Sequence, residues 1–325
     1  MVVEALHKLV AGTSLERAEA RALMEKILGG RATEAQLGAL LAALRLKGET
    51  VDELVGFAEA MRASAQPIFA DQPLPPEEPL LDTCGTGGDA AGTFNVSTAA
   101  ALVAAAAGVR VAKHGNRSIS SQCGSADVME ALGVNIHLAP TRIGDCIRAL
   151  GIGFVFAPLV HTAMQHAQKA RRDLRFRSVF NLLGPLTNPA GVNAQVLGVF
   201  DARWLEPVAQ ALAGLGTHRA FVVHSRDGLD EASLAGETRV AELNQGEVSC
   251  YEIRPEDFGL RRASLDAVRG GDAAANAGII RRVLQGEKGP ARDVVSLNAA
   301  LALVAAGRAD SPPEAATCAA EAIDS

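Results

Sequence analysis

The chain has 325 residues, a formal net charge of −6, 48% hydrophobic residues and 21% charged residues. This length suits one large domain or two of moderate size. The acidic balance, with one Trp and one Tyr, argues against a broad nucleic-acid surface or a stacking platform for single strands. We expect no membrane span and no secretory signal. The five cysteines form no C-x-x-C pair, which favours reduced thiols and a cytoplasmic protein.

The first 72 residues predict a helical domain. Capping boxes at Thr13-x-x-Glu16, Thr33-x-x-Gln36 and Thr50-x-x-Glu53 each precede an apolar run of helical period. The helical runs end near glycines, which suit a left-handed cap. Helices of this length bury little by themselves, so we expect them to pack on the rest of the chain or on a second subunit.

The segment 71–79 contains four prolines and two glutamates, which predicts an extended linker. We place the domain boundary there, between a helical domain (1–72) and a larger domain (73–325). In the larger domain, apolar strand-like segments alternate with helical patterns. This alternation predicts an α/β fold with a mostly parallel central sheet flanked by helices. Strands are expected at 80–84, 109–113, 134–138, 153–157, 194–200 and 219–224, and helices at 98–107, 126–132, 142–150 and 205–215.

Two later segments depart from this alternation. Residues 238–253 alternate like an antiparallel hairpin. Residues 161–172 predict a helix that ends in the basic run Lys169, Arg171 and Arg172, and 180–189 is dominated by residues typical of turns.

A glycine loop follows the first expected strand, from Cys84 to Asp89, and hydroxyl residues then open an alanine-rich helix at Asn95–Thr98. Free backbone N–H groups and a positive helix end favour a bound phosphate. The loop lacks the Gly-Lys-Ser/Thr ending of the phosphate-binding (Walker A) loop, which argues against a nucleoside triphosphatase. Gly85-x-Gly87-x-x-Ala90 also fits a loose dinucleotide motif, but the second strand is expected to end in Lys113 rather than in an acid that would hold a ribose.

Two further loops carry charge. The segment Lys113–Ser118 offers cations, an amide and hydroxyls at the same sheet edge, and more serines follow it. The turn Asp227–Glu231 does not match an EF-hand, but its adjacent carboxylates Asp230 and Glu231 suit Mg²⁺ bound together with substrate phosphates. Taken alone, this turn is equally compatible with a solvated surface loop.

In order and spacing, these motifs resemble the anthranilate phosphoribosyltransferase family. The resemblance rests on Gly85-Thr86-Gly87-Gly88-Asp89, Asn95-Val96-Ser97-Thr98, Lys113-His114-Gly115-Asn116-Arg117-Ser118, Cys123-Gly124-Ser125-Ala126-Asp127, Phe156-Ala157-Pro158, His161-x-Ala163-Met164, the segment 180–189 and the turn 227–231. It spans nearly the whole chain.

The resemblance implies a homodimeric enzyme of tryptophan biosynthesis that joins anthranilate to phosphoribosyl pyrophosphate (PRPP) and releases pyrophosphate. It implies a small helical domain that mediates dimerisation beside a larger α/β domain, with the segment near 161–185 packed back on the helical domain. The cofactor would be Mg²⁺, as a pair of ions with PRPP bound. No nucleic acid and no membrane would be partners.

The resemblance also implies roles for individual residues. PRPP would be bound by Gly85, Gly88, Asp89, Thr93, Asn95, Val96, Ser97, Thr98, Lys113, His114, Gly115, Asn116, Arg117, Ser118, Ile119, Ser120, Ser121 and Ser125. Anthranilate would contact Gly85, His114, Asn116, His161 and Arg171, and Mg²⁺ would be held by Ser97, Asp230 and Glu231. No general base is identified. Cys123 and Ser178 depart from the family pattern, and neither is expected to touch a predicted ligand residue.

Two other functions are compatible with this fold. One is a nucleoside phosphorylase that uses phosphate and a pyrimidine base, against which the Lys113–Ser118 loop and the Asp230–Glu231 pair argue. The other is a non-catalytic relative that binds nucleic acid, which the net charge of −6 disfavours.

Overall fold

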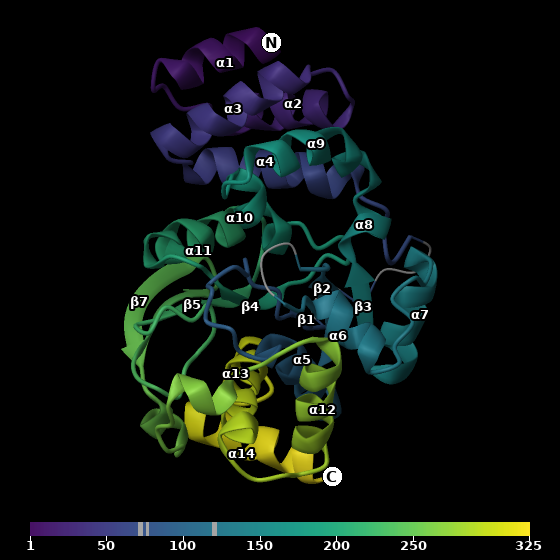
Figure 1. Ribbon diagram of the computed structural model, residues 1–325, viewed down its shortest axis with the longest axis vertical. Helices are drawn as coiled ribbons and strands as arrows, with labels where there is room; N and C mark the ends of the chain where they lie inside the picture. Colours follow the sequence, from purple (N-terminus) through teal and green to yellow (C-terminus); the bar gives the residue numbers. More distant parts are fainter. Residues whose placement is uncertain (71–73, 76–77, 119–121) are drawn as a thin grey trace.

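The computed structural model describes residues 1–70, 74–75, 78–118 and 122–325. Its first four helices form a layer at one end of the molecule (Figure 1). They are α1 (Val2–Val10), α2 (Arg17–Leu28), α3 (Glu34–Lys47) and α4 (Val51–Ser64). Among the described residues, no helix is both long and apolar enough to cross a membrane.

The capping boxes predicted at Thr33 and Thr50 are confirmed, whereas the one predicted at Thr13 is wrong. Helix α2 begins three residues later, and Glu16 is its N-cap. A tertiary contact explains the shift. The backbone N–H of Leu15 donates to the buried carboxylate of Glu53 at 2.9 Å, which holds the segment before α2 outside the helix.

Helices α2 and α4 approach each other closely at Gly56. A Cβ at this position would lie 2.2 Å from the backbone oxygen of Arg17, so only glycine fits. Gly56→Ala is therefore expected to lower the free energy of unfolding by about 3 kcal/mol through overpacking. Gly38→Ala in α3 is the matched control, because a Cβ there meets nothing within 4 Å. Denaturant unfolding of both variants checks this, and equal stabilities would contradict it.

The larger domain is built on one seven-stranded sheet with the order β3-β2-β1-β4-β5-β6-β7. The first five strands in this order are parallel, and β6 and β7 are antiparallel, which confirms the mostly parallel sheet and the hairpin. The strands are β1 (Leu80–Asp82), β2 (Arg110–Gly115), β3 (Ile152–Phe156), β4 (Ala194–Gly198), β5 (Arg219–Ser225), β6 (Thr238–Asn244) and β7 (Glu247–Ile253).

Helices cover both faces of the sheet (Figure 1). Helices α5 (Val96–Ala106), α12 (Ala273–Leu284), α13 (Pro290–Ala305) and α14 (Pro312–Asp324) lie on one face, while α10 (Val179–Leu186) and α11 (Leu205–Gly214) lie on the other. The remaining helices are α6 (Ser125–Ala131), α7 (Pro140–Leu150), α8 (Ala157–Val160) and α9 (Gln165–Leu174). One apolar core continues from α2–α4 through α9, α10 and α11 to the sheet. Helix α9 packs on α2 and α3, while α10 lies between α4 and α11 (Figure 1).

The strand predicted at 134–138 is wrong. These residues form turns between α6 and α7. The side-chain oxygen of Asn135 accepts the backbone N–H of His137 at 2.9 Å, a local turn that competes with extended structure. Val134 is exposed, so the alternating apolar residues at 134–138 do not form the buried face of a strand.

The segment 180–189, predicted to be turns, instead begins as helix α10. Its apolar side chains are buried, and Ser178 and Asn181 form its capping box. Pro185 is tolerated near the end of the helix, where its carbonyl accepts the side-chain amide of Gln195 at 2.8 Å. Burial of an apolar face has outweighed turn propensity here.

Candidate functional site

The glycine loop leaves β1 and is held against the neighbouring strand β4. The backbone N–H of Thr86 donates to Gly198 O at 2.8 Å, and a Cβ on Gly85 would lie 3.0 Å from the same oxygen. Gly87 and Gly88 have positive φ of 65° and 79°, which favours glycine. The loop therefore lies at the carboxyl edge of the sheet, where ligands of α/β proteins bind.

Helix α5 begins directly after this loop. In its first turn, Val96 and Thr98 are buried. The backbone N–H of Ser97 donates to Glu231 Oε1 at 2.8 Å. Thr93, nearer the loop, pairs with Arg269 in an isolated bridge.

The side chain of Asn95 is engaged within the protein. Its amide donates to Cys123 O at 3.2 Å, and its oxygen accepts from the buried amide of Asn276 at 3.0 Å. The Cys123 thiol also lies 3.4 Å from Asn95 Oδ1. The expectation that Cys123 touches no predicted ligand residue is therefore wrong.

Three carboxylates gather beside the N-terminus of α5. The backbone N–H of Asp230 lies 3.3 Å from Asp89 Oδ2, and Glu231 adjoins them. Burial and the nearby Asp89 raise the pKa of Asp230 to about 7. Burial and Asp230 raise the pKa of Glu231 well above its usual value. Glu231 Oε2 is buried without a hydrogen-bond partner among the described residues.

These carboxylates fit a hard divalent cation. The donor set is all oxygen, as Mg²⁺ prefers. Burial first, and then repulsion between the neighbouring carboxylates, raises the pKa values of Asp230 and Glu231, and a bound cation would offset both effects. Glu231 Oε2, which has no partner within the described ranges, supplies a ligand atom.

Lys113 and His114 are neighbours on β2 and project to opposite faces of the sheet, because side chains alternate along a strand. The strand continues to Gly115, so Lys113 lies within it rather than at its end, where the sequence predicted it. The Lys113 ammonium is buried and donates to Thr83 O at 3.1 Å. His114 Nδ1 lies 3.1 Å from Gly184 O in α10.

On the α10 side, two histidine rings lie together. The centroids of His114 and His161 are 5.3 Å apart. Burial lowers the pKa of His114 to about 3 and that of His161 to about 4, so both rings are neutral near pH 7. The Nε2 atoms of both rings are buried without partners in the described part of the chain.

Arg171 contacts α10, the same helix that His114 contacts. Its guanidinium stacks on Phe180 of α10 at 5.1 Å, and burial lowers its pKa. Phe180 and Gly184 are four residues apart and share one face of α10. Arg171 and His114 therefore contact α10 about one helical turn apart. None of the ion pairs among the described residues includes Arg171, which leaves its charge available to a ligand anion.

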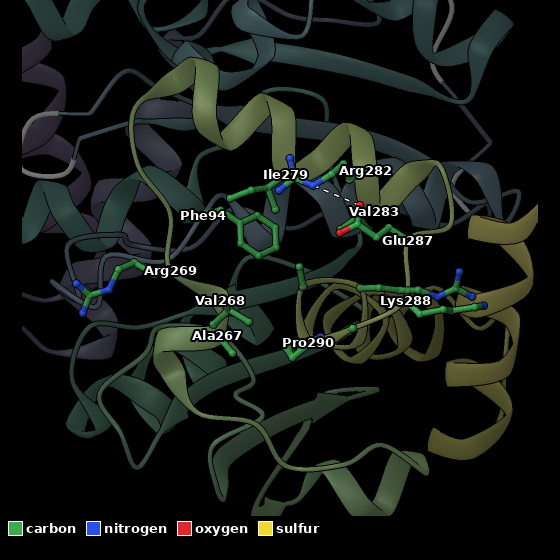
Figure 2. Close-up of a pocket in the computed structure, with 13 residues that line it drawn as sticks. Phe94, Ala267, Val268, Arg269, Ile279, Arg282, Val283, Glu287, Lys288 and Pro290 are labelled. Carbon is green, nitrogen blue, oxygen red and sulfur yellow. Dashed lines mark ion pairs between the residues drawn. The ribbon is translucent and has the colours of Figure 1, made fainter.

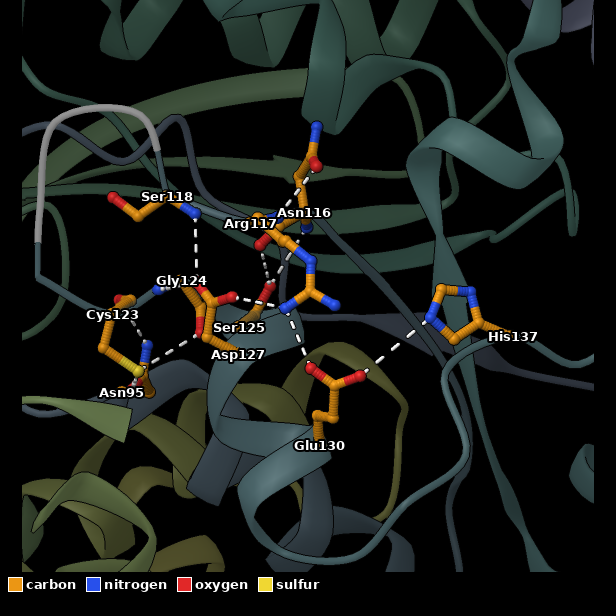
Figure 3. Close-up of polar contacts among 10 residues, drawn as sticks. All are labelled: Asn95, Asn116, Arg117, Ser118, Cys123, Gly124, Ser125, Asp127, Glu130 and His137. Atoms are coloured by element: carbon orange, nitrogen blue, oxygen red, sulfur yellow. Dashed lines mark hydrogen bonds and ion pairs between the residues drawn. The ribbon is translucent and has the colours of Figure 1, made fainter. Parts of the chain in front are cut away.

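The loop after β2 is organised by Asp127 (Figure 3). Its carboxylate accepts the backbone N–H groups of Ser118 at 3.2 Å and Gly124 at 2.9 Å, and pairs with Arg117 at 2.7 Å. Arg117 also pairs with Glu130 at 2.9 Å. The Arg117 charge therefore stabilises the loop.

Gly115 and Asn116, which were also predicted to bind PRPP, lie at the end of β2 and directly after it. Asn116 is exposed, and its backbone N–H donates to Ser125 Oγ at 3.2 Å. Gly115 is required because a Cβ would lie 2.3 Å from the same hydroxyl. Ile119, Ser120 and Ser121 lie outside the described residues.

Two residues that sequence analysis did not assign lie in the site. Arg177 donates to Gly88 O and stacks on Phe200 at 4.5 Å, so it joins the glycine loop to the segment after α9. Asp82 is fully buried and accepts the backbone N–H of His114 at 3.1 Å. The available signals were the arginines Arg175 and Arg177 directly after α9, and an acid directly after two leucines.

A separate cavity of about 280 Å³ lies behind Phe94 (Figure 2). Its cations already have carboxylate partners, since Arg282 pairs with Glu287 at 3.4 Å and Arg292 with Asp324 at 2.5 Å. It also lacks the carboxylate cluster described above. The sheet edge is therefore the better candidate site.

Comparisons with known proteins show the family of this chain. Residues 77–325 match the "Glycosyl transferase family, a/b domain", and residues 3–65 match the "Glycosyl transferase family, helical bundle domain". The anthranilate phosphoribosyltransferase of Desulforudis audaxviator is 54% identical over 100% of this chain and 92% of its own length. That of Brevibacillus brevis is 54% identical over 100% of this chain and 94% of its own length.

The crystal structure of anthranilate phosphoribosyltransferase (TrpD) from Thermus thermophilus has a TM-score of 0.91 and 47% identity, covering 98% of this chain and 94% of that one. The Saccharomyces cerevisiae enzyme in complex with PRPP and Mg has a TM-score of 0.88 and 28% identity, covering 99% and 93%. Sequence and fold thus agree, and the chain belongs to the anthranilate phosphoribosyltransferase family.

Proposed function

We propose that this chain transfers the phosphoribosyl group of PRPP to the amine of anthranilate, releasing pyrophosphate, in tryptophan biosynthesis. The observation that carries this is the pairing of two unlike clusters at one sheet edge. Carboxylates and the glycine loop lie beside α5, while neutral histidines and Arg171, which has no ion pair within the described part of the chain, lie beside α10. A metal-bound pyrophosphate suits the first cluster, and an aromatic acid suits the second.

The carboxylate cluster would hold Mg²⁺ through Asp230, Glu231 and Ser97, as a pair of ions when PRPP is bound. Yeast homologues are described in complex with PRPP and Mg, or with Mg bound. When bound, the ions stabilise negative charge on the departing pyrophosphate. The protein positions the carboxylates through the Ser97 N–H and the Asp89–Asp230 contact.

PRPP would be bound by the loop residues and the start of α5. The backbone N–H groups of a glycine loop and of a helix N-terminus suit phosphate oxygens. We assign this role to the same residues as the sequence did: Gly85, Gly88, Asp89, Thr93, Asn95–Thr98, Lys113–Ser121 and Ser125. Because the Lys113 ammonium is buried against Thr83, its contribution is a nearby positive charge.

Anthranilate would be positioned by Arg171, with Gly85, Asn116, His114 and His161 around it. A guanidinium matches a carboxylate with a planar, two-pronged contact. The neutral imidazoles can accept hydrogen bonds from an amine without repelling Arg171. A related yeast structure is described with 4-fluoroanthranilate.

The reaction needs little proton transfer. An aromatic amine is already neutral at pH 7, which agrees with the absence of an assigned general base. Breaking the bond to pyrophosphate leaves an oxocarbenium-like sugar, as in glycoside hydrolysis. We infer an inverting displacement without a covalent enzyme intermediate. Holding both substrates in line can lower the barrier by about 7–11 kcal/mol in favourable cases.

We further propose a homodimer formed through the helical domain at 1–72, with 73–325 carrying the reaction, in the cytoplasm. Exposed apolar side chains on α1 and α3, such as Val3, Val10 and Leu46, support a covered surface there. Light scattering with and without disruption of these side chains tests the assembly.

Incubation with Mg²⁺, PRPP and anthranilate tests the proposed function. We expect phosphoribosylanthranilate and pyrophosphate to form, and no turnover by well-folded protein would contradict the proposal. A phosphorolysis assay with thymidine or uridine separates it from the phosphorylase alternative.

Arg171→Ala is expected to raise KM for anthranilate by about 10- to 100-fold, because a charged hydrogen bond is worth about 1.5–3 kcal/mol. KM for PRPP should change much less. Arg172→Ala, an exposed neighbour on α9, is the matched control. Steady-state kinetics check this, and an unchanged KM for anthranilate would remove Arg171 from the site.

A further inference from the structure

Three side chains of different ligand type lie together where β1 and β2 end. Ligand atoms of Asp82, Cys84 and His114 all lie within 4.8 Å of one another. We propose that this cluster is a second metal site, which binds a borderline-soft divalent ion such as Zn²⁺ and is separate from the Asp230–Glu231 cluster.

His114 is oriented as a metal ligand. Its Nδ1 lies 3.1 Å from Gly184 O. Because a carbonyl oxygen only accepts, Nδ1 carries the hydrogen and Nε2 carries a free lone pair. Nε2 is buried and has no hydrogen-bond partner among the residues that the structure describes. Metal-binding histidines typically donate their other ring N–H to a carboxylate or backbone carbonyl in this way.

Asp82 is also held in place. Its Oδ1 accepts the backbone N–H groups of Cys84 and His114, each at 3.1 Å. Its Oδ2 accepts the side-chain amide of Asn188 at 2.9 Å. These contacts connect the two strands that supply the ligands. Lys113 projects from the other face of β2, so its ammonium does not occupy the cluster.

The donor set decides the class of ion. Thiolate, imidazole and carboxylate together suit Zn²⁺ and its neighbours in the first transition row, while Mg²⁺ prefers oxygen alone. The all-oxygen cluster at Asp230 and Glu231 suits Mg²⁺, so the two sites differ in the ion they select. Three protein ligands leave one tetrahedral position open, as in catalytic rather than structural zinc sites.

Occupation of this site has a consequence for catalysis, and this step rests on the proposed function. His114 is proposed to line the path of anthranilate, and Gly85 directly follows Cys84. An ion bound to His114 Nε2 would take the lone pair offered to the substrate amine. Zn²⁺ should therefore inhibit in competition with anthranilate, and a chelator should restore activity.

The first test uses Co²⁺ as a spectroscopic probe on the full chain without substrates, in excess Mg²⁺. We expect a thiolate-to-cobalt charge-transfer band at one ion per chain, displaced by Zn²⁺. Cys84→Ser should abolish the band, while Cys318→Ser, at a site distant in the sequence, should keep it. Absence of the band, or its survival in Cys84→Ser, overturns the proposal. Thermal unfolding of both variants confirms that they fold.

The second test measures inhibition. Cys84→Ser should weaken Zn²⁺ inhibition by about 100-fold, as expected for disruption of a metal site. Each variant is compared with its own activity without Zn²⁺. If Zn²⁺ inhibits Cys84→Ser and the parent chain equally, the proposed competition between Zn²⁺ at this site and anthranilate is wrong. Co²⁺ binding through Cys84 in a chain without transferase activity would instead contradict the proposed function and leave the metal site standing.

Discussion

Glu231→Gln is expected to lower kcat/KM for PRPP by about 100- to 1000-fold, the usual cost of removing a preorganised electrostatic contact. The amide can still accept the Ser97 N–H, so the local hydrogen bond should persist. The charge that holds Mg²⁺ is lost. Steady-state kinetics at several Mg²⁺ concentrations measure the effect, with Glu247→Gln on the exposed hairpin as the control.

Glu231→Gln is expected to lower activity but not to lower the stability of the metal-free protein. Burial and neighbouring carboxylates raise the pKa of Glu231, so its ionised form destabilises the metal-free protein. Glu231→Gln should therefore unfold at an equal or higher temperature than the parent chain without Mg²⁺, and should gain less from added Mg²⁺. A variant that keeps the full stabilisation by Mg²⁺ would show that the ion binds elsewhere.

Gly198→Ala is expected to reduce activity by about 100-fold or more. A Cβ at this position in β4 would lie 1.3 Å from the backbone oxygen of Asp230, so the turn that carries the carboxylates must move. A displacement of about 1 Å at a positioned group can cost about 100-fold in rate. Gly278→Ala in α12 is the control, because its nearest neighbour is a flexible arginine tip at 3.7 Å.

Kinetics and unfolding together check this prediction. If Gly198→Ala displaces Asp230, KM for PRPP at fixed Mg²⁺ should rise. Adding Arg171→Ala to this variant should still raise KM for anthranilate as it does in the parent chain, because the α10 side of the site is unchanged. Parent-like kinetics in a folded Gly198→Ala variant would show that the contact between β4 and the turn does not position the metal ligands.

Local sequence signals predicted those elements whose structure is decided locally. The capping boxes at Thr33 and Thr50 are complete within four residues, so their helices begin where expected. The hairpin at 238–253 follows from its alternation. By contrast, the start of α2 depends on Glu53, which is distant in the sequence, and α10 forms because its apolar face is buried. Short-range patterns carry no information on such contacts.

The candidate site shows the same division. The glycine loop and the Asp230–Glu231 pair could be named from their residue types and order, whereas Arg171 was named through the family resemblance. The sequence also indicated a sheet-edge location, because parallel strands bring their carboxyl ends together. Arg177 and Asp82 were missed, because a basic run and a buried acid acquire meaning only from their neighbours.

By itself, the sequence determined the two-part α/β organisation, the family resemblance and the presence of phosphate, metal and carboxylate-binding residue types. Only the tertiary structure decided which face of the sheet each group occupies. Side-chain alternation on β2 sends Lys113 towards α5 and His114 towards α10. The structure also left Glu231 Oε2 and His114 Nε2 buried without partners among the described residues. Burial and pairing depend on contacts between distant segments, which no local pattern encodes.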